Sequence, residues 1–469
     1  MKFSPTKLPF TIYLGSGSAE NLLICNQILR NLPEKRLVCA GTWQQKPVLV
    51  KLFLDSRNAQ RHWLRENSGV ELLKHAGICT PDLLFSGQLD NGTPVLVFEL
   101  LEDAETALDL WDNLVSMDQK TALLNQLLDV IAGLHNSGLL QDDLHLENFL
   151  VSNQRIYAID GDAVSSNGQS AVVDLVDTTS NLALFFAQLP PRDDTFLDAA
   201  ILYYAQQRGM DGAQLAAEIK AALPEVRRKR RNKYVKKCYR TCSEFVRSQI
   251  KGQVSVSRRE AQGETLDRLL NDPDDFIGQG EILKDGNTCT VVRVRTDACD
   301  WVIKRYNIKS PLHYLSRCFR QTRAWTSWGN AHHLKISGIE TPKAIAVIEK
   351  RFGPLRSTGY YVCDFQDGPL ASNFFASGRV DLPVIEEAAK SFVRLFELFK
   401  KLGIHHGDCK ATNFLVVDGA PCVLDLDAMC EPPNRQLFNK LYKADRERFL
   451  SNWQNCPELR HWFDLHLPR

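Results

Sequence analysis

The segment HHGDCKATNFLVVDGAPCVLDLDAM, residues 405–429, decides how the rest of the chain is interpreted. Three polar side chains stand in its apolar, strand-like setting: Asp408, Asn413 and Asp425. Single Asp and Asn residues often only form turns or cap them. The spacing therefore indicates a functional site only if it recurs elsewhere in the chain.

The same spacing recurs in LLQDDLHLENFLVSNQRIYAIDGDA, residues 139–163. Here Asp143, Asn148 and Asp160 each precede their counterparts by 265 positions. A duplicate of the whole pattern argues against chance turn residues and favours a repeated functional site.

Shorter matches lie upstream of both segments. AGICTP at 76–81 corresponds to SGIETP at 337–342, and VLVKLF at 48–53 resembles WVIKRY at 301–306. Their offsets are slightly shorter, as differences in loop length would make them. The chain is therefore predicted to be a tandem repeat of one domain.

Both copies have the same predicted order of elements. Runs of β-branched residues joined by turn residues predict strands, and these are followed by a helix, further strands, a second helix and the polar loop. The predicted helices include 59–77, 119–138 and 384–403, and the predicted strands include 36–43, 46–54, 281–284, 288–296 and 301–306. The expected fold class is α+β, with two domains that each join a small antiparallel β-sheet lobe to a helical lobe.

The domain boundaries are predicted from changes in composition. The first domain is expected over 1–254, including a basic helical region at about 193–254. A segment rich in Arg, Glu, Gly and Asp predicts a linker over 255–272, and the second domain is expected over 273–469.

The basic region contains RRKRRNKYVKKCYR, residues 227–240, without an acidic residue. Helical spacing predicts an amphipathic helix with Tyr234, Cys238, Cys242 and Phe245 on its apolar side. Arg228, Arg231, Lys233 and Lys237 are then expected to be free to meet phosphates. An anionic lipid surface or a phosphorylated sugar is the expected partner, and specific binding of nucleic acid is not expected because no reader motif accompanies the charge.

The composition is that of a folded protein without a strong global charge. Of its 469 residues, 44% are hydrophobic and 24% charged, and the formal net charge is +1. The thirteen cysteines contain no CxxC pair and are interpreted as reduced thiols of a cytosolic protein. The N-terminal segment lacks the unbroken apolar core of a signal peptide, and no apolar run has membrane-spanning length.

The repeated residues suit phosphoryl transfer. The first aspartate, Asp408 or Asp143, would deprotonate an acceptor hydroxyl. The amide and the second carboxylate would hold Mg²⁺ against ATP. A lysine on an early strand completes such a site by neutralising phosphate charge, and Lys51 and Lys304 occupy that place.

These motifs resemble the catalytic and metal loops of the protein-kinase-like superfamily. Residues 316–347 of the second copy more closely resemble bacterial kinases that phosphorylate heptose or Kdo sugars of the lipopolysaccharide core. The resemblance implies the following roles: Asp408 and Asp143 catalytic, Asn413, Asp425, Asn148 and Asp160 as metal ligands, and Lys304 and Lys51 at the ATP phosphates. It also aligns Glu66 with the helix glutamate that pairs with the lysine, and Lys410 with a lysine that reaches the transferring phosphoryl group.

Both copies depart from the family pattern. The first has Gln141-Asp142 in place of His-Gly, and the second has Ser327 where the glutamate is expected. Neither has a glycine-rich phosphate loop, since Gly278-Gln-Gly280 precedes the predicted first strand of the second copy. His145, in the place of Lys410, resembles the aminoglycoside phosphotransferases.

The resulting expectation is an ATP- and Mg²⁺-dependent kinase acting on a sugar hydroxyl of the lipopolysaccharide inner core. It would be cytoplasmic and peripheral on the inner face of the cytoplasmic membrane. Two alternatives stay open: a kinase for a soluble small molecule, and a pair of pseudokinase domains with a regulatory role.

Overall fold

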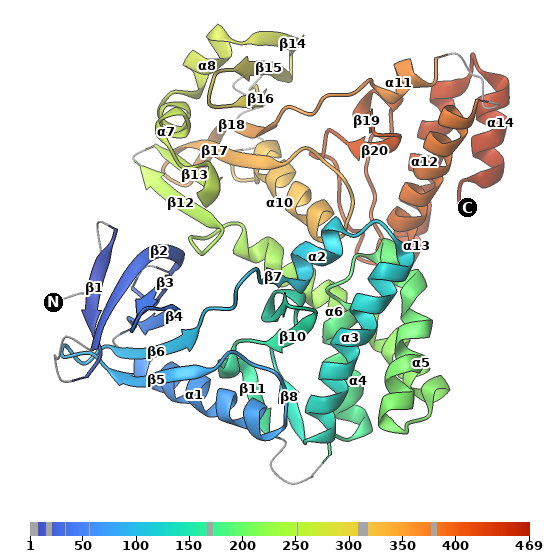
Figure 1. Ribbon diagram of the computed structural model, residues 1–469. Coiled ribbons are helices and arrows are strands. Elements are labelled where there is room, and N and C mark those ends of the chain that lie inside the picture. Colours follow the sequence, from blue (N-terminus) through green and yellow to red (C-terminus); the bar gives the residue numbers. More distant parts are fainter. Residues whose placement is uncertain are drawn as a thin grey trace. The chain divides into compact units, whose positions relative to one another are not determined.

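The computed structural model describes residues 8–15, 21–32, 34–55, 57–166, 172–250, 252–307, 318–376 and 382–469. Parts of the N-terminal segment used above, and the first two residues of the 316–347 match, lie outside these ranges. The chain divides into two compact units, Met1–Leu189 with Asp193–Arg230, and Pro190–Arg192 with Arg231–Arg469. Each unit has an antiparallel sheet followed in the chain by helices and short hairpins (Figure 1).

The first unit contains a six-stranded antiparallel sheet in the order β1-β2-β3-β4-β6-β5. Its strands are β1 Phe10–Tyr13, β2 Leu22–Leu32, β3 Arg36–Trp43, β4 Lys46–Phe53, β5 Leu83–Gln88 and β6 Pro94–Glu99. Alternate residues of β4, Val48, Val50 and Leu52, are buried. Strand β4 pairs with β3 on one side and β6 on the other, so Lys51 stands on an interior strand.

The helical part of the first unit follows the sheet. Its helices are α1 Ala59–His75, α2 Ala107–Asn113, α3 Met117–Asn136, α4 Leu175–Phe186, α5 Leu197–Arg208 and α6 Gly212–Lys237, of which the part from Arg231 onward belongs to the second unit. Its short strands are β7 Glu105–Thr106, β8 Leu139–Gln141, β9 Phe149–Ser152, β10 Arg155–Ala158 and β11 Val164–Ser166. Helix α1 ends as predicted, with Gly77 at φ +70°, a conformation that favours glycine.

The second unit contains a seven-stranded antiparallel sheet in the order β12-β13-β17-β18-β16-β15-β14. Its strands are β12 Phe245–Ile250, β13 Gln253–Arg258, β14 Glu281–Gly286, β15 Cys289–Arg295, β16 Asp300–Tyr306, β17 Ala344–Phe352 and β18 Leu355–Asp364. Lys304 lies on β16, which pairs with β15 and β18, so this lysine also stands on an interior strand.

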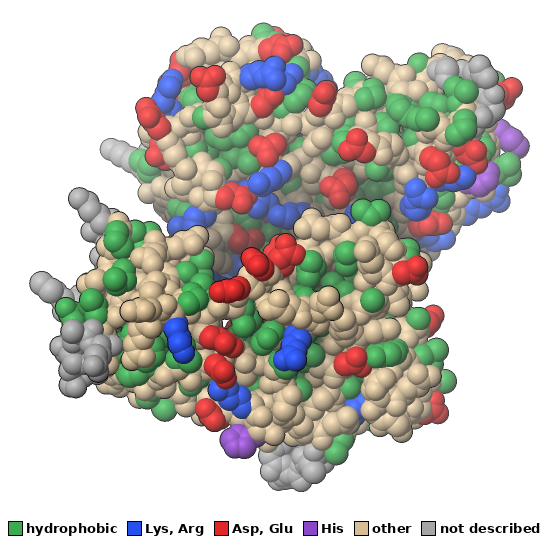
Figure 2. All heavy atoms as spheres, viewed as in Figure 1, with side chains coloured by type: hydrophobic (Ala, Val, Ile, Leu, Met, Phe, Trp, Pro, Cys, Tyr) green, Lys and Arg blue, Asp and Glu red, His purple; other side chains and the backbone are tan. Residues whose placement is uncertain are grey.

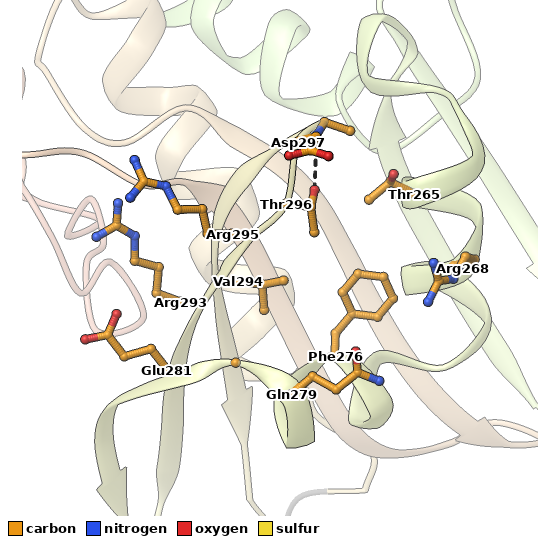
Figure 3. Close-up of a pocket in the computed structure, with 12 residues that line it drawn as sticks. Thr265, Arg268, Phe276, Gln279, Glu281, Arg293, Val294, Arg295, Thr296 and Asp297 are labelled. Carbon is orange, nitrogen blue, oxygen red and sulfur yellow. Dashed lines mark hydrogen bonds between the residues drawn. The ribbon is translucent and has the colours of Figure 1, made fainter.

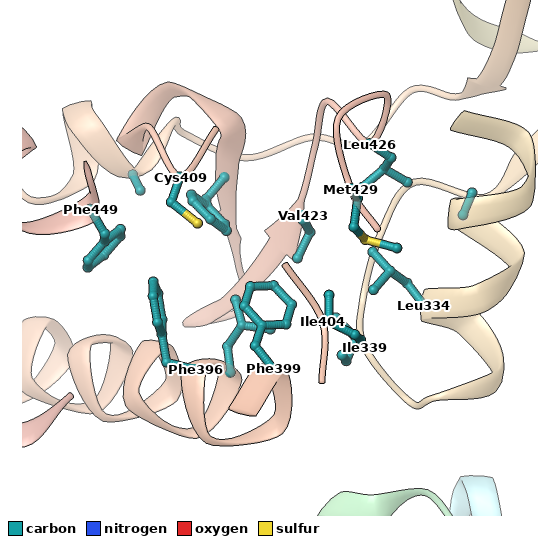
Figure 4. Close-up of a cluster of buried hydrophobic side chains, with 14 of the residues drawn as sticks. Leu334, Ile339, Phe396, Phe399, Ile404, Cys409, Val423, Leu426, Met429 and Phe449 are labelled. Atoms are coloured by element: carbon teal, nitrogen blue, oxygen red, sulfur yellow. The ribbon is translucent and has the colours of Figure 1, made fainter. Parts of the chain in front are cut away.

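The helices of the second unit are α7 Glu264–Asn271, α8 Pro273–Gln279, α10 Arg323–Ile336, α11 Ala371–Phe374, α12 Pro383–Leu402, α13 Arg435–Leu450 and α14 Pro457–His466. A hairpin of β19 Phe414–Val417 and β20 Ala420–Val423 follows α12. Phe396 and Phe399 of α12 belong to the main core, together with Val423 at the end of the hairpin (Figure 4). This core therefore supports the segment that carries the polar residues.

The predicted linker over 255–272 is wrong. Its first residues belong to β13, which pairs with β12 and β17 inside the second sheet, and α7 follows. Val254 and Val256 are buried in this strand, and Arg258 donates from Nε to the carbonyl of Ala344 at 2.7 Å. The strand was missed because its apolar residues alternate over only a few positions. The polar and glycine residues around the short helix α7 then gave the segment the composition of a linker. The second unit therefore begins well before residue 273.

The predicted basic helix is also shorter than expected. Helix α6 ends at Lys237, and Phe245 instead begins β12. The backbone N–H of Cys242 donates to the carbonyl of Phe245 at 2.9 Å, so the two residues close a turn. Their spacing from Tyr234 only imitated a helical period, because the turn and the strand that follow α6 place apolar residues at similar intervals.

Several basic side chains of this helix are already paired within their own units. Arg227 binds Asp194 with two hydrogen bonds of 2.8 and 2.6 Å. Arg231 is buried and lies 2.5 Å from the Glu431 carboxylate. Arg228 contacts Glu225 and Lys237 contacts Glu244, so the expectation that Arg228, Arg231 and Lys237 are free is wrong.

The surface drawn in Figure 2 has acidic and basic side chains interspersed, in keeping with the near-neutral composition. Over the described parts of the chain, no helix combines the length and the apolar character needed to cross a membrane.

Candidate functional site

In the second unit, Asn413 and Asp425 stand at the two ends of the β19–β20 hairpin. Asn413 immediately precedes β19, and Asp425 follows β20 with φ +54°. The backbone N–H of Leu424 donates to the carbonyl of Asn413 at 2.8 Å. This bond closes the hairpin and brings the amide and the carboxylate to the same end of it.

Asp408 is held by its own loop. Asn413 donates from Nδ2 to the Asp408 backbone carbonyl at 2.9 Å and to its Oδ2 at 3.2 Å. Lys410 Nζ lies 2.8 Å from Oδ2, and Arg448 Nε of α13 lies 3.8 Å from Oδ1. The predicted catalytic carboxylate is thus partly exposed between two cations, and Asn413 keeps its amide oxygen for another partner.

His406 connects the Asp408 loop to the hairpin. Its Nε2 donates to the carbonyl of Leu424 at 3.0 Å, and its Nδ1 accepts from the backbone N–H of Asp408 at 3.3 Å. Burial lowers the pKa of His406, and the nearby Asp445 carboxylate only partly offsets that effect. A neutral ring with its proton on Nε2 satisfies both bonds.

Lys304 contacts the second carboxylate directly. Its Nζ binds Asp425 and lies 3.7 Å from Asp427 Oδ2. Burial disfavours the Lys304 ammonium, but its neighbours, including these carboxylates, outweigh burial and raise its pKa. Burial likewise raises the pKa of Asp425, but Lys304 outweighs it and the net direction is downward. Both groups are therefore charged at neutral pH.

In the first unit the lysine has the predicted glutamate partner. Lys51 Nζ lies 2.5 Å from Glu66 Oε1, and Glu66 is 1% exposed. Arg36 lies 3.9 Å from the same carboxylate. Burial opposes ionisation of Glu66, but Lys51 and then Arg36 lower its pKa, so a buried anion is stabilised by two cations.

Asp160 lies at the end of the β9–β10 hairpin with φ +71°, as Asp425 does after β20. The backbone N–H of Ile159 donates to the carbonyl of Asn148 at 2.9 Å, which brings the amide beside it. Among the described residues, Asp160 Oδ1 is buried without a hydrogen-bond partner. Burial and the charge of Glu66 raise the pKa of Asp160.

The first unit's Asp143 loop is built from different side chains. Gln141 donates from Nε2 to the carbonyl of Ile159 at 3.2 Å, the bond that His406 makes in the second unit. Asn148 donates to the Asp143 backbone carbonyl at 2.8 Å, and His145 Nε2 lies 3.5 Å from the Asp143 carboxylate. The replacement of His-Gly by Gln-Asp therefore preserves the link between loop and hairpin.

The residues present fit a magnesium ion. Each hairpin brings together an amide oxygen and a carboxylate, the hard oxygen ligands that Mg²⁺ prefers. A cation bound there would give the buried Asp160 Oδ1 a partner. Its charge would also offset the burial and the repulsion from Glu66 that raise the pKa of Asp160. Asn148 with Asp160, and Asn413 with Asp425, are the residues that would hold such an ion.

A separate cavity of about 570 Å³ lies in the second unit (Figure 3). It is bounded by α7, α8, the start of β14, the end of β15 and the turn that follows β15. Arg268, Arg293 and Arg295 are among its twelve lining residues, and no residue predicted for the site is. Arg293 is already paired with Asp300 at 2.6 Å, so the arginines that line the cavity are not all without an acidic partner.

Sequence reasoning missed three contributors to these sites. Asp445 on α13 accepts hydrogen bonds from the Asp408 loop, Arg448 approaches Asp408, and Asp427 approaches Lys304. Asp445 and Arg448 lie far along the chain and carry no local signal. Asp427 had one, because Asp162 precedes it by 265 positions, the same offset that identified the other repeated residues.

Comparison with known proteins identifies no family. No protein-family model matches the chain, and no curated protein matches it. Among solved structures, the chain is similar to one described as vaccinia related kinase 3, with 12% sequence identity and a TM-score of 0.29, over 48% of this chain and 93% of that chain. Similarity at this level adds nothing to the geometry described above.

Proposed function

We propose that the chain is a kinase built from two protein-kinase-like domains, and that the second unit transfers the γ-phosphoryl group of ATP to an alcohol. The observation that carries this proposal is the arrangement of Asp408, which Asn413 holds and Lys410 and Arg448 flank. A carboxylate of this kind is suited to orient and deprotonate a hydroxyl, and the adjacent cations to neutralise charge on a transferring phosphoryl group.

In the proposed reaction, Asp408 accepts the proton of the acceptor hydroxyl as its oxygen forms a bond to the γ-phosphorus. The bond from that phosphorus to the bridging oxygen breaks, and ADP leaves with the electron pair. Lys304 would neutralise charge on the ATP phosphates. Asn413 and Asp425 would hold Mg²⁺, which supplies further neutralisation when bound.

The acceptor we propose is a sugar hydroxyl of the lipopolysaccharide inner core, heptose or Kdo. The support is the resemblance of residues 316–347, of which the described part forms α10 and the start of β17. Such an acceptor is lipid-linked, so we also propose that the protein works in the cytoplasm and at the inner face of the cytoplasmic membrane.

For the first unit we propose nucleotide binding with slow or no turnover. Its Lys51–Glu66 pair and the Asn148–Asp160 end of its hairpin suit Mg²⁺ and ATP. Its Asp143 is accompanied by His145 rather than by a lysine. We propose that both units derive from one duplicated domain, because corresponding contacts recur at the 265-residue offset.

The proposal is tested by incubating the full chain with ATP, Mg²⁺ and purified lipopolysaccharide core acceptors, and by mapping the product by mass. We expect one added phosphate on a core sugar. Asp408→Asn should lower turnover by a factor of about a hundred or more, as removal of a positioned base does. Asp143→Asn is the matched control and should leave most of the activity. The reverse pattern would assign the chemistry to the first unit, and transfer only to a soluble small molecule would replace the acceptor.

A further inference from the structure

A second aspartate follows each proposed metal ligand by two residues and contacts the helix that precedes it in the chain. In the first unit, His62 Nδ1 of α1 lies 2.7 Å from Asp162 Oδ2. In the second unit, Arg323 Nη2 of α10 lies 2.6 Å from Asp427 Oδ2. Counted back from the matching Gly-Ile-x-Thr-Pro segments, His62 and Arg323 occupy the same helix position. The helix is therefore attached to the metal loop at the same point in both units.

The two loops are also fixed to their helices at a second common point. In the first unit, Gly69 and Gly161 approach so closely that a Cβ on Gly69 would lie 1.9 Å from the Gly161 carbonyl oxygen. In the second unit, Asn330 at the position of Gly69 donates from Nδ2 to the carbonyl of Leu426 at 2.8 Å. The second aspartate thus has a defined place against the helix in each unit.

The two units differ in the side chains that contact the lysine proposed to bind the ATP phosphates. Lys51 has Glu66 at 2.5 Å. The helix position of that glutamate is Ser327 in the second unit, which is 1% exposed and shares a 2.9 Å hydrogen bond with the hydroxyl of Tyr306. Among the described residues, the carboxylates within 4 Å of Lys304 Nζ are those of Asp425 and Asp427.

We propose that Asp427 is the positioning residue that replaces the helix glutamate in the second unit, and that Arg323 holds it in place. This inference rests on the proposed function of Lys304 at the ATP phosphates. Asp425 is the proposed metal ligand, so its charge is shared with the metal when one is bound. Asp427 is 7% exposed in its side chain and fixed by Arg323, and it lies beside the lysine without being one of the proposed metal ligands.

The placement has a consequence for how the second unit works. In the first unit, the counter-charge of the lysine is carried by helix α1, and Asp162 meets His62, Arg65 and Arg36 instead. In the second unit, the counter-charge belongs to the same loop as the metal ligand. The position of Lys304 is therefore coupled to that loop, and helix α10 reaches Lys304 through the loop, which Arg323 and Asn330 hold.

The test uses the full chain and an acyl-phosphate derivative of ATP, which acylates a lysine that lies beside the bound phosphates. Mass mapping separates labelling at Lys304 from labelling at Lys51 in one sample, so each unit serves as the control for the other. In Asp427→Asn, we expect labelling at Lys304 to fall about tenfold, as loss of a charge-assisted contact would predict, with Lys51 unchanged. The KM for ATP should rise by a similar factor, and kcat should fall by a smaller factor. The matched variant Asp162→Asn should leave labelling at Lys51 close to wild type.

A rescue distinguishes positioning from a purely structural role. Tyr306→Phe with Ser327→Glu reproduces the Phe53 and Glu66 of the first unit, and in the Asp427→Asn background it should restore labelling at Lys304. Thermal unfolding of each variant verifies the fold. Undiminished labelling of Lys304 in Asp427→Asn overturns the inference and leaves the proposed function standing. Loss of labelling that the rescue does not restore, in a folded protein, overturns the replacement of the glutamate. Absence of both labelling and phosphate transfer in the wild-type chain would instead refute the proposed function.

Discussion

The Asp445 carboxylate accepts a hydrogen bond from the backbone N–H of His406 at 2.7 Å. It also accepts from the backbone N–H of Gly407 at 3.1 Å and contacts His405 Nδ1 at 2.8 Å. Asp445 is buried on α13, so this helix sets the backbone of the loop that presents Asp408. In the first unit Asn181 takes the corresponding place, and its Nδ2 donates to the carbonyl of Gln141 at 2.9 Å.

Asp445→Asn should therefore destabilise the second unit and reduce phosphate transfer together. Replacing the carboxylate by an amide leaves buried N–H groups poorly satisfied, at a cost of about 2 kcal/mol. Chemical unfolding and turnover measured on the same variant test this. Glu447→Gln, an exposed change on the same helix, is the control and should leave both unchanged. Normal turnover in Asp445→Asn would show that the loop keeps its geometry without α13.

Binding of ATP with Mg²⁺ should protect the backbone of both units from hydrogen exchange. We expect protection around Lys51 and residues 148–160 in the first unit, and around Lys304 and residues 413–425 in the second. Asp160→Ala should remove the protection in the first unit alone, and Asp425→Ala that in the second alone, because each carboxylate serves its own hairpin. Protection around Lys51 that survives in Asp160→Ala would exclude Asp160 as a metal ligand.

The first unit should lose stability in mild acid because of His135. This buried ring shares a 2.5 Å hydrogen bond with the Tyr204 hydroxyl and donates from Nε2 to Asn181 at 3.0 Å. Burial lowers the pKa of His135 to about 4 from an ordinary value of 6.5. Because the folded pKa is the lower one, the unfolded chain binds the proton more tightly. The stability that the neutral His135 ring contributes is fully present above about pH 6.5. It is lost as the pH falls towards 4, by about 3 kcal/mol in total.

His135→Gln keeps one donor and one acceptor and should flatten this dependence between pH 6.5 and 4. Denaturant unfolding of the variant and the wild type across that range measures the difference. The exposed His461→Gln is the control and should follow the wild type. Equal pH dependence for His135→Gln and the wild type would mean that His135 binds its proton equally in the folded and unfolded chains, so that burial does not lower its pKa.

The basic segment 227–240 is proposed to bind anionic membranes. Its binding should depend on the exposed residues Lys233, Lys236 and Arg240. Each contact with an anionic surface contributes about 1 kcal/mol and is screened within roughly 8 Å at physiological salt. Reversing all three to Glu should therefore weaken sedimentation with anionic vesicles in a salt-sensitive way while ATP binding survives. Arg231→Glu should instead lower stability, because it would face Glu431. Unchanged sedimentation of the triple variant at low salt would remove this segment from the proposal.

The sequence by itself determined the elements and residues whose signals are local or repeated. The periodic runs predicted β3, β4, α1, α3 and α12 close to their observed bounds. The 265-residue offset identified the two hairpins with their Asp and Asn side chains, and counting from a repeated segment identified the Lys51–Glu66 pair. These inferences were possible because strand and helix periods depend on neighbouring residues, and because a repeat preserves spacing.

Only the tertiary structure decided which charged groups meet across the chain. The partners of Lys304, the support of the Asp408 loop by Asp445 and the pairing of Arg231 with Glu431 join residues separated by long stretches of sequence. Composition made 255–272 resemble a linker and 227–240 a helix with one free basic face, but β13 is buried between neighbouring strands and several arginines are paired. Sequence records the charge of a side chain, whereas its partner and its exposure depend on how distant segments pack.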